Sequence, residues 1–194
     1  VTQGQWERVM GTTPWKGESY VKVGSDYAAT YVSWNDAQDF ISKLNQKEGR
    51  TYRLPTEGEW ENACRAGSES MYCFGDSTTT LKEYAWFDAN ADDIGEEYAH
   101  RVGVKRANSF GLYDMHGNVY EWCSDWYDEK YYGSLAGKLT IDPEGSAAAS
   151  GSSRVLRGGS WVNDPRGTRS ADRFRDTPTY RGSDVGFRIV CELD

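Results

Sequence analysis

Apolar residues in the first third of the chain recur at the spacing of an amphipathic helix. The clearest case is the run SWNDAQDFISKLNQKEG, in which Ser33 and Asp36 match a capping box and Gly49 stands where a helix stops. Four apolar side chains share one face of this helix: Ala37, Phe40, Ile41 and Leu44. The pattern predicts a capped helix that packs one side against a core.

The run RLPTEGEWENACRAG repeats this pattern. Thr56 and Glu59 again match a capping box, and Gly67 is expected to end the helix. The apolar face of this second helix holds Trp60, Ala63 and Cys64. A shorter helix is predicted over Gln3–Met10, so most helical structure is expected in the first 67 residues.

From Met71 to Leu193 the pattern changes to short apolar runs separated by Gly, Asn and Asp, which predicts short strands and tight turns. Two such runs, RVLRGGSW and GFRIV, frame 24 mostly small and polar residues at 162–185. Between Trp161 and Gly186 there is no Cys, His, Glu or Lys, so the segment lacks the common nucleophiles, bases and soft-metal ligands. We expect a rigid scaffold that presents this segment to contact a ligand rather than to react with it.

Length and composition fit one domain over residues 1–194 with a substantial core. Only 38% of the residues are hydrophobic, but 8 Trp and 13 Tyr supply large side chains for that core. The Gly/Ser/Ala run at 144–153 predicts a flexible surface loop. The opening VTQGQWERVMG begins inside a pattern, so we expect a fragment or processed form whose N-terminal end is truncated.

Charge and cysteine spacing exclude several classes of function. The formal net charge of −8 argues against a nucleic-acid partner, because phosphate binding needs a basic surface. No run approaches the roughly 20 apolar residues of a membrane span. The four cysteines show no CxxC or CxxH spacing, which disfavours zinc: Cys64, Cys73, Cys123 and Cys191. Buried free thiols and a single disulfide both remain open.

Four motifs occur together and in order: RLPTEGEWENACRAG, GLYDMHGNVYEWCSDWY, RVLRGGSW and GFRIV. Through them almost the whole chain resembles the formylglycine-generating enzyme (sulfatase-modifying factor) superfamily. The resemblance implies an α+β, C-type-lectin-like fold, in which two helices pack on a twisted antiparallel sheet with much irregular structure. The two capped helices and the short strands expected above agree with that fold.

The enzymatic activity of that family does not carry over at its metal-binding positions. In the family, two cysteines shortly after the RGGS motif and five positions apart hold copper and perform the oxidation. The matching positions here are Asn163 and Thr168, and neither supplies the thiolate that binds soft Cu(I). Related sulfoxide synthases use iron held by histidines, whereas this chain has only His100 and His116, and His116 is expected to be structural. We therefore expect neither copper nor iron, and we favour a non-catalytic domain.

The GLYDMHGNVYEW motif resembles a calcium site of the family. The matching ligands are the side chains of Asp114 and Glu121 and the backbone carbonyls of Gly117 and Val119. Mixed carboxylate and carbonyl oxygens suit a structural Ca²⁺. The alternative is a turn in which the two carboxylates accept only backbone hydrogen bonds.

The framed segment also resembles the variable region of diversity-generating retroelement proteins, which display mutagenised side chains on lectin-like domains. Adenine-directed mutation of Asn codons, as in those proteins, does not yield Lys, Glu, Gln, Trp or Met. None of these five types occurs from Val162 to Asp184, whereas the other 171 positions hold 37 of them, which would give about five in a stretch of this length. The resemblance implies that 162–185 is a variable, ligand-binding segment.

The ligand face implied by this resemblance comprises Val162, Asn163, Asp164, Phe174, Arg175, Asp176, Thr179, Tyr180, Gly182, Ser183 and Asp184. The expected partner is a protein or other macromolecule, and a retroelement variable protein would favour a cell-surface or extracellular location. Two alternatives stay open. One is a formylglycine-generating-enzyme-like oxidase or protein-modifying enzyme with a relocated site, and the other is a structural relative that is not diversified.

Overall fold

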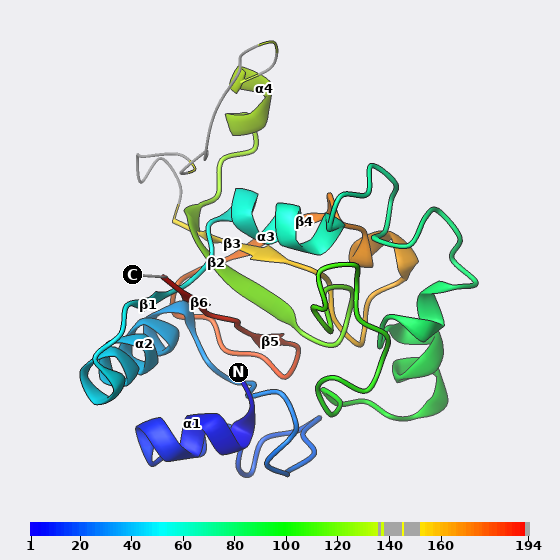
Figure 1. Ribbon diagram of the computed structural model, residues 1–194. Coiled ribbons are helices and arrows are strands. Elements are labelled where there is room, and N and C mark those ends of the chain that lie inside the picture. Colours follow the sequence, from blue (N-terminus) through cyan, green and yellow to red (C-terminus); the bar gives the residue numbers. More distant parts are fainter. Residues whose placement is uncertain (136, 138–144, 146–151, 193–194) are drawn as a thin grey trace.

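The computed structural model describes residues 1–135, 137, 145 and 152–192 (Figure 1). Its helices are α1 (Gln3–Met10), α2 (Trp34–Glu48), α3 (Glu57–Arg65) and α4 (Tyr131–Leu135). Its strands are β1 (Tyr52–Arg53), β2 (Tyr120–Trp126), β3 (Arg154–Arg157), β4 (Arg173–Asp176), β5 (Val185–Gly186) and β6 (Val190–Cys191). Short 3-10 turns cover Leu81–Glu83, Asp88–Asn90, Asp92–Ile94 and Pro165–Thr168. Most of the surface loop predicted at 144–153 lies outside the described residues.

Local capping explains where the three longer helices begin. Thr2, Ser33 and Thr56 each accept a hydrogen bond from the backbone of the first turn. In return, the backbone N–H of each cap residue donates to the side chain of the third helical residue. The helix predicted over Gln3–Met10 and the two predicted capping boxes are confirmed. Helix α3 ends at Arg65, one residue earlier than a cap at Gly67 would give. Ala66, rather than Gly67, is the capping residue and takes the left-handed conformation at φ 47°.

The main sheet has the strand order β4-β3-β2-β5. Its three longer strands pair antiparallel, and β5 adds one parallel pair beside β2, so the sheet is mixed. A second sheet of two residues per strand pairs β1 with β6. This order places β4 at one edge of the main sheet and β5 at the other.

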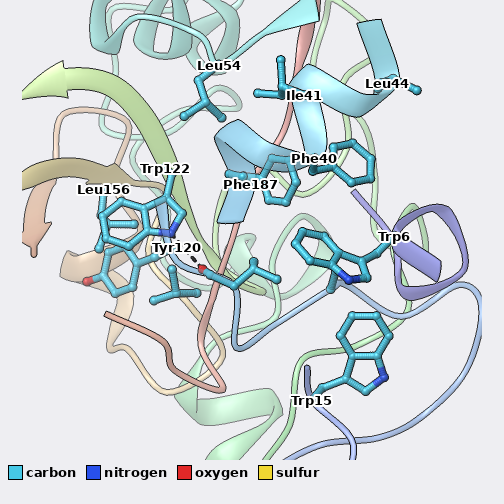
Figure 2. Close-up of a cluster of buried hydrophobic side chains, with 14 residues drawn as sticks. Trp6, Trp15, Phe40, Ile41, Leu44, Leu54, Tyr120, Trp122, Leu156 and Phe187 are labelled. Carbon is cyan, nitrogen blue, oxygen red and sulfur yellow. Dashed lines mark hydrogen bonds between the residues drawn. The ribbon is translucent and has the colours of Figure 1, made fainter. Parts of the chain in front are cut away.

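Helices cover both faces of the main sheet (Figure 1). On one face, side chains of α1 and α2 pack on Trp122 and Leu156, and the rings of Trp6, Phe40 and Phe187 meet at centroid distances of 5.3 to 6.2 Å (Figure 2). On the other face, α3 packs on β2 and β3 through a cluster of Trp60, Cys64, Met115, Cys123 and Val155. The predicted apolar faces of both capped helices therefore lie in the core, and the α+β class is confirmed.

The region between α3 and β2 differs from the expected run of short strands. Residues 71–119 form 3-10 turns, isolated bridges and loops, and they contain no strand longer than a bridge. The short helix α4 was not predicted either. Of the helices described, none is both long enough and apolar enough to cross a membrane.

Candidate functional site

A buried ion network fixes the edge strand β4. Arg157 on β3 is fully buried, and its guanidinium donates to the carboxylate of Glu61 and to the carbonyl of Ser170 at 2.8 Å. Arg173, the first residue of β4, forms a two-point ion pair with buried Glu57 at 2.5 and 2.8 Å. Because both glutamates lie on α3, this network ties β4 to the helix that covers one face of the sheet.

The RGGSW motif leads into a tight turn. The Asn163 side-chain oxygen accepts hydrogen bonds from the backbone N–H (2.8 Å) and hydroxyl (2.7 Å) of Ser160, and its backbone carbonyl accepts from Asp88 N–H (2.9 Å). Gly159 has φ 72°, and a Cβ at this position would lie 2.5 Å from the Gly167 carbonyl oxygen. The start of segment 162–185 is therefore held by specific contacts.

The predicted ligand-binding residues, which we name the C-terminal face, differ in exposure. The exposed ones are Val162, Asp164, Phe174, Arg175, Thr179 and Tyr180. Those that are partly buried are Asn163, Asp176, Ser183 and Asp184. Gly182 is buried, whereas a displayed residue is expected to be exposed. Its carbonyl accepts a hydrogen bond from Tyr31 N–H at 2.9 Å, which holds it against the loop before α2.

An aromatic pair lies at the edge of the C-terminal face. The ring of Phe174 stacks on that of Tyr120 at a centroid distance of 5.1 Å, and 47% of Phe174 is exposed although Tyr120 is buried. Burial raises the pKa of Tyr120 to about 12, and the nearby carboxylates of Asp172 and Asp184 act in the same direction. The phenol is therefore neutral at physiological pH, and the pair presents an apolar surface beside acidic groups.

The end of the segment returns to the sheet through Asp184, whose carbonyl accepts Tyr120 N–H at 2.8 Å. Burial raises the pKa of the Asp184 carboxyl, and Asp176 acts in the same direction. A Cβ built on Gly182 would lie 2.7 Å from both the Asp184 carboxylate and the Tyr180 hydroxyl. Carboxylate and phenol therefore converge over this glycine.

The positions that hold copper in the enzymes are occupied by side chains with structural contacts. Thr168 is fully buried and its hydroxyl donates to the Pro165 carbonyl at 3.0 Å, while Asn163 serves the turn described above. Neither residue has a sulfur atom. Burial raises the pKa of Cys64 to about 12 and that of Cys73 to about 11, so these thiols are protonated and poorly nucleophilic.

His116 has structural partners, as predicted. Its Nδ1 lies 2.8 Å from the carbonyl of Thr168, and its Nε2 accepts the backbone N–H of Cys73 at 3.2 Å. This pairing requires the tautomer with the proton on Nδ1. Burial lowers the pKa of His116 to about 4, so the ring is neutral at physiological pH.

Three of the four predicted calcium ligands, Asp114, Val119 and Glu121, line one cavity of about 310 Å³. Asp114 adopts φ 56° and accepts Gly103 N–H at 2.7 Å, and burial raises the pKa of its carboxyl. The fourth, Gly117, is not among the lining residues. A carboxylate that is desolvated in this way is a suitable oxygen ligand for a hard cation.

Glu121 already has strong partners in this cavity. It accepts the indole N–H of Trp60 at 2.7 Å and a two-point ion pair from Arg188 at 2.5 and 2.9 Å. Arg188 also donates to the carbonyl of Tyr113 at 3.1 Å. Carboxylate and carbonyl oxygens are of the kind that calcium prefers, but an ion here would share Glu121 with the Arg188 guanidinium.

The segment before α2 contributes residues that the sequence did not identify. Tyr20 is 54% exposed and packs beside Trp161 at a ring distance of 6.1 Å, and Tyr31 binds the Gly182 carbonyl. Both tyrosines have left-handed backbones, with φ 59° and 55°. The available signal was weak: three tyrosines in a polar, Gly-containing stretch from residue 17 to 31.

The amino-acid sequence of this chain is similar to those of several known proteins. The model of the sulfatase-modifying factor enzyme 1-like domain matches residues 1–193. The formylglycine-generating enzyme of Streptomyces coelicolor is 34% identical over 180 residues, covering 87% of this chain and 54% of the enzyme. The inactive Cα-formylglycine-generating enzyme 2 of Bos taurus is 30% identical over 195 residues, covering 95% and 56%. The chain thus spans about half the length of these two relatives.

One solved structure is matched over most of its own length as well as most of this chain. Treponema denticola variable protein 1 superimposes with a TM-score of 0.86 at 31% identity, covering 98% of this chain and 81% of that protein. The C-type-lectin-like fold of the formylglycine-generating-enzyme type and the likeness to a variable protein, both expected from the motifs, are confirmed.

Proposed function

The chain belongs to the sulfatase-modifying factor enzyme 1-like family, and within it we propose that this protein is a non-catalytic, ligand-binding member that displays a diversified surface, as a retroelement variable protein does. The observation that carries the proposal is the combination at 162–184: Asn163 and Thr168 stand at the copper positions, and the same segment presents exposed side chains on a scaffold held by buried contacts. The likeness to a variable protein supports it.

The composition of the C-terminal face also supports binding. Aromatic and Arg side chains dominate interface hot spots, and Phe174, Arg175 and Tyr180 are exposed there. Small polar residues around them supply adaptable contacts, as in antibody loops. The genome offers a direct test: an adenine-rich near-copy of the coding segment beside a reverse transcriptase gene supports diversification, and a locus without either contradicts it.

An oxidase with a relocated site is the second candidate function, since active enzymes are among the relatives. We predict that the purified protein makes no formylglycine, because no thiolate stands at position 163 or 168. Incubation with a sulfatase-type Cys peptide, copper and oxygen should leave the peptide mass unchanged, with an active family enzyme as the positive control. Catalytic turnover of the peptide would contradict the non-catalytic proposal.

Calcium binding in the cavity at Asp114 is a separate proposal. An ion held by Asp114, Glu121 and the carbonyls of Gly117 and Val119 would bind only the folded state, and at 100 times its Kd it would add about 2.7 kcal/mol to the free energy of unfolding. Calcium should therefore raise the melting temperature above that measured in chelator, and Asp114→Asn should remove most of this difference.

The matched control for this test is Asp93→Asn, which removes one negative charge from an exposed turn outside the cavity. It should keep the full calcium effect. Identical melting curves of the unsubstituted protein in calcium and in chelator would leave Glu121 with Arg188 and Trp60 as its partners and reject the calcium site.

A further inference from the structure

The charged groups around the aromatic part of the C-terminal face are acidic. Asp172, Asp184 and Asp164 all act on the Tyr120 phenol, and Asp184 and Asp176 act on that of Tyr180. These carboxylates come from separate turns and strands that the fold brings together. Within residues 1–135 and 152–192, no ion pair involves Asp164, Asp176 or Asp184. Apart from Arg175, the charged residues of the C-terminal face are therefore all acidic.

Apart from Arg166, which is exposed on the 3-10 turn at Pro165–Thr168, the nearby arginines are occupied elsewhere. Arg169 pairs with Asp172, and Arg181 forms a two-point ion pair with Asp36 at 2.8 Å. Side chains alternate between the two sides of a strand, so Arg175 lies on the opposite side of β4 from Phe174. Its guanidinium stacks there on another ring, 4.5 Å from the centroid of Tyr127. The side of β4 that carries Phe174 is therefore aromatic and acidic, without Arg175.

Tyrosines from outside the variable segment extend this aromatic surface. Tyr20 lies beside Trp161, and the hydroxyl of Tyr31 donates to the Ser19 carbonyl at 2.9 Å. The backbone bond from Tyr31 to Gly182 joins this loop to the end of the segment. Tyr20, Val162, Phe174 and Tyr180 are thus exposed large hydrophobic side chains on chain segments that these contacts connect.

We propose that the C-terminal face recognises a basic segment of a protein partner, whose Arg or Lys side chains lie over the Phe174–Tyr120 pair and Tyr20 and are paired by Asp164, Asp176 and Asp184. This inference rests on the proposed function and specifies the chemistry of its ligand. Aromatic faces attract cations, and nearby carboxylates supply the counter-charge. Tyr20 and Tyr31 would be fixed contributors to a face whose other members vary.

Binding of a hexa-arginine peptide, compared with hexa-glutamate, tests this proposal by calorimetry and by amide NMR shifts. The shifts should map to Tyr20, Phe174 and Tyr180. Replacing Asp164, Asp176 and Asp184 together by Asn removes three charges but keeps a side-chain oxygen at each position, and it should weaken hexa-arginine binding by about tenfold or more. Phe174→Ala should weaken it while leaving the charge unchanged.

The matched control replaces Asp92, Asp93 and Glu97 by Asn, Asn and Gln, which removes the same charge from an acidic turn that is not part of the C-terminal face. It should change the affinity less than about twofold. An equal loss in both triple variants, or preferential binding of hexa-glutamate, overturns the cationic ligand. Failure of the proposed function would give another result. Substitutions in the C-terminal face would then lower the melting temperature, which is measured without any ligand.

Discussion

Replacing Arg157 by Met should destabilise the protein by about 3–5 kcal/mol, the range found when one partner of a buried ion pair is removed. Arg157 is fully buried and its guanidinium satisfies Glu61 and the carbonyls of Ser170 and Asp172. Met fills similar space but offers no donor, so the carbonyls of Ser170 and Asp172 lose a buried donor and Glu61 keeps only its pair with Arg65. Urea unfolding measures the difference.

Arg65→Met provides a matched control, because Arg65 pairs with the same Glu61 at 2.7 Å but is partly exposed on α3. An exposed i,i+4 pair is worth about 0.3–0.5 kcal/mol, so this variant should unfold almost as the original does. If both variants lose similar stability, Arg157 does not organise the sheet as the contacts indicate, and the scaffold under the C-terminal face must be held by other groups.

Helix starts could be predicted because their causes are local. Thr2, Ser33 and Thr56 lie three residues before the side chain that completes each capping box, so the sequence alone contains the whole interaction. Strands β1 and β5, each of two residues, have no such local signal. They form because Tyr52 meets Cys191 and Val185 meets Tyr120 across long stretches of chain.

The candidate face could be predicted only in outline for the same reason. The framing motifs identified the segment, but the backbone bonds from Asp88 N–H to the Asn163 carbonyl and from Tyr31 N–H to the Gly182 carbonyl join residues that are distant in sequence. The contribution of Tyr20 depends likewise on its contact with Trp161. Composition identifies a surface that is rich in small polar residues, whereas only the fold shows which of them face solvent.

Substitution tolerance should separate the C-terminal face from its scaffold. Val162, Phe174, Arg175 and Thr179 are exposed, so replacing each by another small or polar residue should change stability by about 0.5 kcal/mol or less. Asn163→Ala should cost about 1–3 kcal/mol, because it leaves the Ser160 donors without their acceptor. This difference divides segment 162–185 into exposed and structural positions.

Phe187→Ala should lower the free energy of unfolding by about 3–5 kcal/mol, far more than substitutions at the exposed positions. Phe187 is 2% exposed and packs against Trp6 and Phe40 in the main core. A library over the four exposed positions, scored by soluble expression and melting temperature, should retain most members, while substitutions at Phe187 or Arg157 should be depleted. Ligand binding should vary among library members that fold equally well, because only the displayed chemistry differs between them. If the exposed positions prove as intolerant as Phe187, segment 162–185 is a structural loop and the proposal of a diversified binding surface fails.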